Sequence, residues 1–89
     1  MKTIFTDKGW EQYLEWFRSG DKKAVKKIND LIEDIKKNGL LAGTGQPEQL
    51  KYFDEVRYSR RINQGDRLVY FLDENSDLVI QACRGHYEE

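Results

Sequence analysis

The chain has 89 residues and a nearly balanced charge, with 15 Lys and Arg residues against 16 Asp and Glu residues. This length allows one small domain, which we expect to span residues 1–89, and the balance excludes a strongly basic or strongly acidic protein. Apolar residues make up 38% of the sequence, which is enough to bury a core, so we expect a folded protein.

The cysteine and histidine content narrows the class of protein further. The single cysteine, Cys83, cannot form an internal disulfide, and the apolar stretch at the N-terminus is too short for a signal peptide or a membrane span. One cysteine and one histidine, His86, do not supply the usual zinc ligands. We therefore expect a cytoplasmic protein with no membrane contact, no metal and no other cofactor.

The first predicted elements are a strand from Lys2 to Thr6 and a helix that starts near residue 7. The Thr6 hydroxyl can cap this helix, and Asp7 adds a carboxylate to its first turn. The spacing i, i+3, i+4 and i+7 defines one apolar stripe, which comprises Trp10, Tyr13, Leu14 and Phe17. The Ser19–Gly20 pair ends the helix.

A second helix is predicted to follow directly, capped by Asp21 and ended by Asn38–Gly39. Its apolar face consists of Val25, Ile28, Ile32 and Ile35. Lysines 22, 23, 26, 27, 36 and 37 cluster away from that face. These lysines could contact RNA, but a solvated helix face is the commoner meaning of such a pattern.

Residues 40–47 are predicted to be an irregular connection, without the spacing of a phosphate-binding loop. The β-rich runs that follow it are Val56–Ile62, Arg67–Leu72 and Leu78–Arg84. The links between them are of hairpin length, so these strands should form an antiparallel meander. We expect the helices to cover one face of the sheet and a site to lie on the other.

Arginines are concentrated in residues 57–67, which hold Arg57, Arg60, Arg61 and Arg67 against one carboxylate, Asp66. This local positive charge can attract phosphate at short range. Solvated arginines on the outer face of a strand are the plainer alternative.

Cleavage of RNA by side chains alone requires a base for the 2′-hydroxyl, cations around the phosphorane and an acid for the departing 5′ oxygen. The candidates for these roles are Glu48, Lys51, Arg61, Arg67, His86 and Tyr87. Histidine has the pKa best suited to proton transfer near neutral pH. Each of these residues, taken alone, is more often an ordinary surface group.

Five blocks of sequence point to a known family. In chain order they are Val25–Ile32, Gly45–Lys51, Ser59–Ile62, Arg67–Tyr70 and Ala82–Tyr87. Together they resemble the YoeB-type toxins (the Txe/YoeB family) of the RelE-like toxin–antitoxin superfamily. The resemblance extends from the first strand to Tyr87, and the blocks stand in one order at nearly the family's spacing.

The resemblance implies an α+β, microbial ribonuclease-like fold, with two N-terminal helices packed on a twisted antiparallel sheet. It also implies a ribosome-dependent endoribonuclease that cuts messenger RNA in the A site without a metal. The expected products are a 2′,3′-cyclic phosphate and a free 5′-hydroxyl.

Functional residues follow from the matching positions. The resemblance implies that Glu48 is the general base, His86 the general acid and Arg67 the group that stabilises the phosphorane. Lys51 and Arg61 would hold phosphate. Losing the acid or the base should be severe, because each is typically worth about a hundred- to ten-thousandfold in rate.

The C-terminal site would be shaped by Tyr87, at which family members commonly end. This chain continues with Glu88–Glu89, whose carboxylates could repel RNA or raise the pKa of the neighbouring histidine. Asp66 also departs from the family, which usually has a non-acidic residue there, and it could pair with Arg67 and weaken its charge.

The strand register must bring Arg61 and Arg67 together. A hairpin with a four-residue loop would instead set Ile62 opposite Arg67. We therefore expect a bulge or a five-residue loop over Ile62–Asp66.

The expected partners are the ribosome, messenger RNA and a YefM-like antitoxin, whose acidic side chains would meet Arg57, Arg61 or Arg67. These toxins often dimerise, so a homodimer is also expected. Near-neutral charge predicts poor affinity for free RNA, with the ribosome supplying the encounter. Two alternatives stay open: a non-enzymatic protein that binds a target such as gyrase, and an inactive member that only binds its antitoxin as a co-repressor.

Overall fold

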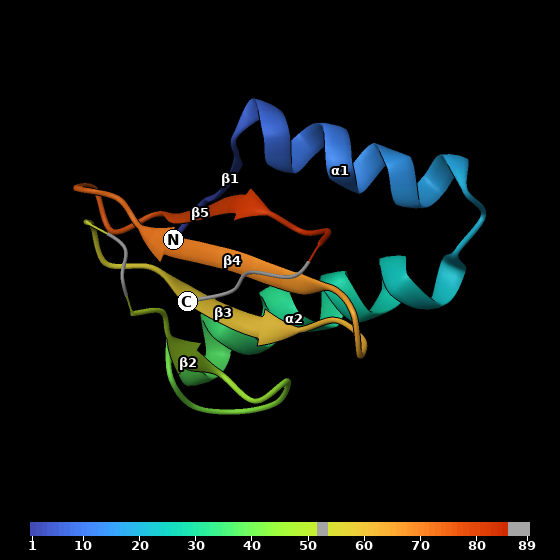
Figure 1. Cartoon of the computed structure of the whole chain (residues 1–89). Helices are drawn as coiled ribbons and strands as arrows, with labels where there is room; N and C mark the ends of the chain where they lie inside the picture. Colours follow the sequence, from blue (N-terminus) through green and yellow to red (C-terminus); the bar gives the residue numbers. More distant parts are fainter. Residues whose placement is uncertain (52–53, 86–89) are drawn as a thin grey trace.

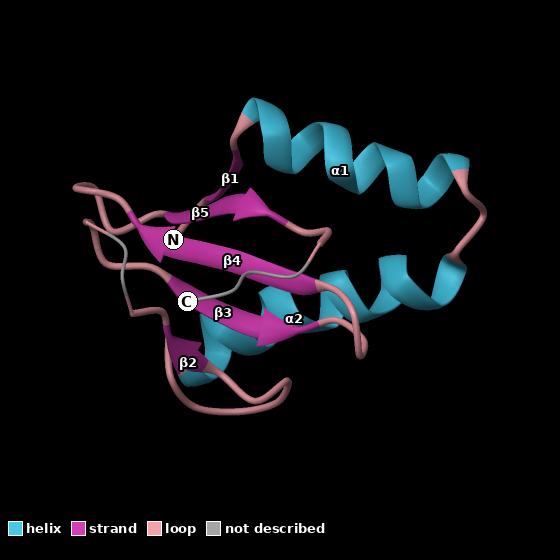
Figure 2. Cartoon of the chain, in the orientation of Figure 1, coloured by secondary structure: helices cyan, strands magenta, loops and turns pink. Residues whose placement is uncertain are grey.

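The computed structural model describes residues 1–51 and 54–85. Its elements are β1 (Thr3–Phe5), α1 (Asp7–Arg18), α2 (Lys22–Asn38), β2 (Glu48–Gln49), β3 (Tyr58–Arg61), β4 (Arg67–Leu72) and β5 (Leu78–Ala82). The strands form one five-stranded sheet in the order β1-β5-β4-β3-β2. In Figure 1, α2 lies behind β3 and β4 and α1 runs along the β5 side, which leaves the front of the sheet free of helices (Figure 2). The predicted α+β class is confirmed.

The helix boundaries predicted from capping residues are correct. The Thr6 side chain accepts the backbone N–H of Gly9 at the start of α1, and the Asp21 side chain accepts that of Ala24 at the start of α2. Gly39 ends α2 with φ of 97°, a left-handed conformation that glycine adopts without strain.

The buried face of α1 differs from the apolar stripe predicted for it. Trp10 and Phe17 are 48% and 55% exposed, whereas Trp16 is only 6% exposed. The Trp16 indole Nε1 donates to the backbone carbonyl of Cys83, 2.8 Å away, and Gln12 Oε1 accepts the Cys83 N–H at 2.7 Å. A polar residue and a tryptophan therefore bind the end of β5, and the stripe of Trp10 and Phe17 turns outward.

Gly9 permits this close packing of α1 on the sheet. A Cβ atom at this position would lie 2.5 Å from the backbone carbonyl oxygen of Ile80 in β5. Such an overlap forces backbone movement, because the neighbouring atom belongs to the main chain of a central element.

Replacing Gly9 with alanine should therefore destabilise the fold, although alanine is the better helix former by about 1 kcal/mol. We expect a net loss of about 1 to 3 kcal/mol in urea unfolding. Gly65→Ala is the matched control, because the nearest atom to a Cβ there is 3.9 Å away. A Gly9→Ala protein as stable as the Gly65→Ala protein would show that the contact with Ile80 is unimportant.

The predicted antiparallel meander is confirmed for β3, β4 and β5, but the sheet as a whole is mixed. β1 pairs in parallel with β5, with Thr3 opposite Leu78 and Phe5 opposite Ile80. The expectation of a wholly antiparallel sheet was wrong because the partner of β1 lies more than 70 residues away and no local signal identifies it. β2, which directly follows the predicted irregular connection and was not predicted as a strand, adds two residues to the other edge.

The register between β3 and β4 agrees with the prediction that Arg61 and Arg67 lie together. Arg61 lies directly opposite Arg67, so the connection is the five-residue loop Ile62–Asp66. β3 is shorter than predicted, spanning Tyr58–Arg61 rather than Val56–Ile62. Because side chains alternate along a strand, this register decides which residues share the open face of the sheet.

The core lies between α2, α1 and the back of the sheet. Its fully buried members include Ile28, Leu31, Ile35, Leu68, Tyr70 and Ile80. Across residues 1–51 and 54–85, no helix is both long and apolar enough to cross a membrane.

Candidate functional site

A polar hollow of about 200 Å³ lies where β2, β3 and β4 meet. Its lining residues are Gln46, Pro47, Glu48, Ser59, Arg61 and Arg67. Glu48 pairs with Ser59 across β2 and β3, and Arg61 pairs with Arg67 across β3 and β4. Residues paired in this way lie on the same face of a sheet, so the register brings one carboxylate and two guanidinium groups together.

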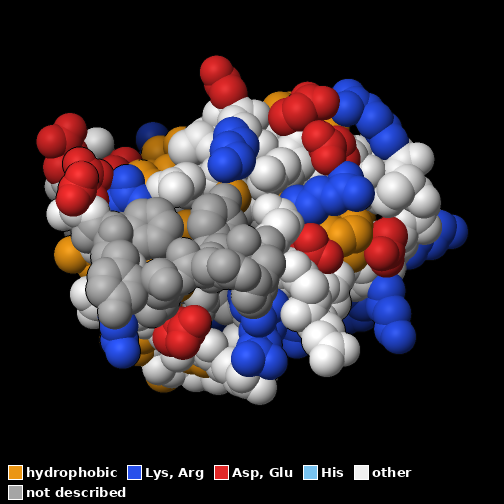
Figure 3. All heavy atoms as spheres, viewed as in Figure 1, with side chains coloured by type: hydrophobic (Ala, Val, Ile, Leu, Met, Phe, Trp, Pro, Cys, Tyr) orange, Lys and Arg blue, Asp and Glu red, His pale blue; other side chains and the backbone are white. Residues whose placement is uncertain are grey.

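The residues that line the hollow lie on the face of the sheet that the helices leave free, and Figure 3 views the molecule from that side. Lys and Arg side chains (blue) and carboxylates (red) are interspersed on this face. Glu48 and Arg61 are exposed there, whereas Arg67 is only 8% exposed. The predicted cation Lys51 is exposed but does not line the hollow. The predicted acid His86 and its neighbour Tyr87 lie outside the described residues, as do Glu88 and Glu89.

Arg67 is held in place by the turn between β3 and β4. Its Nη1 atom donates to the carbonyl oxygens of Asn63, Gln64 and Asp66, at 3.2 to 3.3 Å. No partner occupies its Nε and Nη2 atoms in the part of the chain that the structure describes. A guanidinium fixed on one side, with no partner among the described residues on the other, is preorganised to bind an anion in the hollow.

Asp66 does not form the expected ion pair with Arg67 among the described residues. Its carboxylate instead accepts the backbone N–H of Gly85, with Oδ1 2.8 Å from the nitrogen. The backbone N–H of Arg67 in turn donates to the Gly85 carbonyl at 2.9 Å. These two hydrogen bonds fix the residue that precedes His86 beside β4. Asp66 therefore anchors the C-terminal segment rather than neutralising the arginine.

Arg60 has a different role from the one that its place in the arginine-rich run predicted. It is fully buried on the helix side of the sheet, because it alternates with Ser59 and Arg61 along β3. Arg57 does not line the hollow either, because its guanidinium stacks on the Phe71 ring, 3.6 Å from the centroid. Of the four arginines in the run, Arg61 and Arg67 line the hollow.

The Arg60 guanidinium holds the connection between α2 and β2 in place through hydrogen bonds. It donates to the Tyr70 hydroxyl at 3.0 Å and pairs with the Asp34 carboxylate. Its remaining partners are three backbone carbonyls of the connection, those of Gly39, Ala42 and Thr44. The hydrogen bond from the Thr44 N–H lowers the pKa of Asp34, and the Arg60 pairing lowers it further.

The loop fixed in this way leads directly into the hollow. The carbonyl of Gly45 accepts the backbone N–H of Arg61 at 2.7 Å, just before the segment Gln46–Glu48. Gly45 has a positive φ of 83°, and a Cβ there would lie 2.7 Å from the Leu31 side chain. Sequence reasoning recognised the glycine as a turn former but not this packing.

Cys83 is fully buried beside α1, and its thiol is not a reactive group of the site. Burial raises the pKa of Cys83 to about 12, with further contributions from the negative charges of Glu15 and Asp66. The thiol Sγ lies 3.6 Å from the carbonyl oxygen of Gly9. Residues 1–51 and 54–85 contain no group of three His, Cys, Asp or Glu side chains placed to hold a metal ion.

We therefore expect Cys83 of the folded protein to resist iodoacetamide at mildly alkaline pH, because only the thiolate reacts. Labelling should become rapid and complete in concentrated urea, as followed by mass spectrometry. Rapid stoichiometric labelling without denaturant would contradict the burial described for this residue.

Comparisons with known proteins agree with this fold. The family described as "YoeB-like toxin of bacterial type II toxin-antitoxin system" matches residues 5–87. Toxin YoeB of Escherichia coli K12 is 45% identical over 87 residues, covering 98% of this chain and all of the relative. Toxin YoeB of Synechocystis is 46% identical over 88 residues, covering 99% of each.

Solved structures of related toxins from Staphylococcus aureus have the same fold. A YoeB dimer is 43% identical and superposes with a TM-score of 0.86, covering 98% of each chain. A heterotetrameric YoeB–YefM toxin–antitoxin complex is 45% identical, with a TM-score of 0.83 and the same coverage. The fold and these relatives define a toxin of a bacterial type II toxin–antitoxin system. Within that class, the chain belongs to the YoeB-like family.

Proposed function

We propose that this toxin is a ribosome-dependent endoribonuclease that cleaves messenger RNA in the ribosomal A site and thereby stops translation. The observation that carries the proposal is the set of Glu48, Arg61 and Arg67 around one open hollow, with the residue before His86 fixed next to β4. Glu48 would supply the base and the two arginines the cations that phosphodiester cleavage requires, and His86 would supply the acid.

Glu48 is the proposed general base. Its exposed carboxylate takes the proton of the ribose 2′-hydroxyl, and the 2′ oxygen then attacks the neighbouring phosphorus. Arg67 and Arg61 stabilise the negative charge that develops on the phosphorane oxygens. Arg67 does so with Nε and Nη2, while Nη1 stays bound to the turn.

His86 is the proposed general acid. It donates a proton to the 5′ oxygen as the phosphorus–oxygen bond breaks, which leaves a 2′,3′-cyclic phosphate and a 5′-hydroxyl. The two hydrogen bonds of Gly85 support this assignment, because they fix the start of the terminal segment beside Arg67. Tyr87 would shape this end of the site, and Lys51 would contact a phosphate next to the one that reacts.

A YefM-like antitoxin is the proposed inhibitor, as in the Staphylococcus aureus complex. An acidic segment lying on Arg61 and Arg67 would block the hollow by charge pairing. The dimer of the related toxin supports a homodimer here as well. The bacterial cytoplasm, where ribosomes and messenger RNA are present, is the proposed location.

Cell-free translation tests the proposal. Adding the purified toxin should stop protein synthesis and shorten the messenger RNA, and a YefM-like antitoxin should prevent both effects. Arrested synthesis with intact messenger RNA would overturn the ribonuclease proposal and favour a non-enzymatic toxin. Neither effect, from a protein that still binds antitoxin, would favour an inactive member of the family.

A further inference from the structure

A trough of adjoining hollows continues beyond the candidate site. A second hollow, of about 410 Å³, shares Gln46 and Arg61 with the first. A third, of about 520 Å³, shares Lys27, Ile62 and Asn63 with the second. The trough therefore extends from the site, past the turn between β3 and β4, to the N-terminal half of α2.

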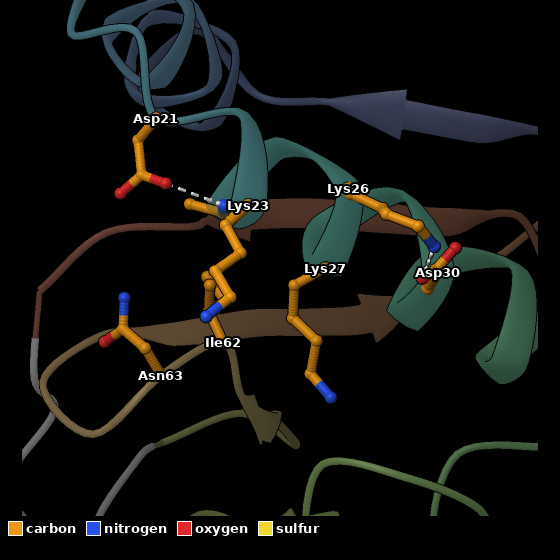
Figure 4. A pocket seen from close by; sticks show the side chains of 8 residues that line it. Asp21, Lys23, Lys26, Lys27, Asp30, Ile62 and Asn63 are labelled. Atoms are coloured by element: carbon orange, nitrogen blue, oxygen red, sulfur yellow. Dashed lines mark hydrogen bonds and ion pairs between the residues drawn. The ribbon is translucent and has the colours of Figure 1, made fainter.

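Two lysines of α2 line the far end of this trough. Figure 4 shows Lys23 and Lys27 extending from the helix on the side of Ile62 and Asn63. Neither ammonium group has an ion-pair partner in the part of the chain that the structure describes. They stand four positions apart, which brings side chains onto the same helix face with roughly 5–6 Å between their Cβ atoms.

The carboxylates nearest to these lysines are engaged elsewhere. Asp30 pairs with Lys26 at 2.8 Å, and Asp21 accepts the N–H of Ala24 as the cap of α2. Asn63 Oδ1 accepts two N–H groups of its own turn, at 2.8 and 2.9 Å. Among the described residues, the trough therefore presents two unpaired ammonium groups, those of Lys23 and Lys27, beside the Lys26–Asp30 ion pair.

The side chains that line the trough carry a net positive charge, although the net charge of the whole chain is negative. Its three hollows contain five Lys and Arg residues and three carboxylates, in a protein of net charge −1. A groove lined by cations that leads away from a phosphodiester site is suited to the backbone of a single strand. The sequence pattern alone favoured a solvated face for these lysines. Their position in the trough instead favours contact with a nucleic-acid backbone.

We propose that the trough binds the sugar–phosphate backbone of the messenger RNA strand on one side of the cleaved linkage. Lys27 and then Lys23 contact successive phosphates as the strand leaves the site. This inference deepens the proposed function and relies on it for the identity of the strand. It assigns part of the substrate affinity to α2, outside the hollow where cleavage takes place.

Binding of a 2′-O-methyl RNA of roughly nine nucleotides tests the trough without cleavage, because its 2′ oxygens cannot attack. Fluorescence anisotropy at low ionic strength compares the wild type with Lys23→Ala/Lys27→Ala. The matched control is Lys36→Ala/Lys37→Ala, which removes the same charge from exposed residues at the other end of α2. We expect the first pair alone to weaken binding roughly tenfold and to reduce the slope of log K against log salt by about 1.4.

An equal loss in both double variants, or an unchanged slope in the first, would overturn the proposal. Cleavage kinetics on ribosomes add a second test: the Lys23/Lys27 variant should raise KM and leave kcat unchanged. Impaired ribosomal cleavage with unchanged oligonucleotide binding would assign these lysines to ribosomal RNA and also overturn it. A wild type that binds the oligonucleotide through the trough but never cleaves would refute the proposed function and retain the trough as an RNA site.

Discussion

Replacing Glu48 with glutamine is expected to lower kcat for A-site cleavage about a hundred- to ten-thousandfold, because the 2′-hydroxyl loses its proposed base. The substitution keeps the size of the side chain and its place opposite Ser59 in the register of β2 and β3. Single-turnover cleavage on programmed ribosomes measures the effect directly. Binding to the ribosome should change little, because both arginines of the hollow remain.

Two controls separate this loss from misfolding and from a simple change of charge. Glu48 is exposed, so Glu48→Gln should unfold at the same urea concentration as the wild type. Glu74→Gln removes an exposed carboxylate from the turn between β4 and β5 and should leave cleavage unchanged. A Glu48→Gln protein that cleaves at the wild-type rate would mean that another group accepts the proton.

Replacing Arg60 with methionine should cost about 3 to 5 kcal/mol of unfolding free energy, since it leaves Asp34 and three loop carbonyls without their buried partner. Small domains are stable by only about 5 to 15 kcal/mol, so the variant should be close to unfolding at room temperature. Urea denaturation measures the loss. The neighbouring substitution Arg61→Met removes the same charge from an exposed position and should change stability by less than about 0.5 kcal/mol.

Acid should weaken the same interaction in the wild type. The pKa of Asp34 is lowered in the folded state, so its contribution to stability is present above the ordinary value of 3.8 and is lost as the pH falls below it. Arg60→Met should therefore lose less stability on acidification than the wild type. Equal stability of Arg60→Met and Arg61→Met at neutral pH would show that the buried pair does not hold the connection.

Local signals in the sequence were sufficient to predict the boundaries of the two helices. Thr6 and Asp21 cap the helices as predicted, because capping depends on residues three positions apart. The register between β3 and β4 was predicted in another way, from the requirement that Arg61 and Arg67 share one site. That requirement left a bulge or a five-residue loop open, and the structure has the loop.

Long-range contacts account for what sequence reasoning missed. The buried face of α1 depends on Gly9 and Gln12, whose partners lie on and just after β5, so the visible aromatic stripe was misleading. Adjacent arginines on β3 face opposite sides, and only the sheet shows that Arg60 is the buried one. From the sequence, Asp66 could have paired with the next residue, but its carboxylate accepts the Gly85 N–H instead.

The proposed function requires that the groups around the hollow cut messenger RNA within the ribosome. Its most direct test is primer extension, with analysis of the RNA ends, on ribosomes stalled with a defined A-site codon and mixed with wild-type or Glu48→Gln toxin. We expect one cut at that codon for the wild type, with a 2′,3′-cyclic phosphate and a 5′-hydroxyl, and almost none for the variant. No cut in either sample, or equal cutting in both, would contradict it.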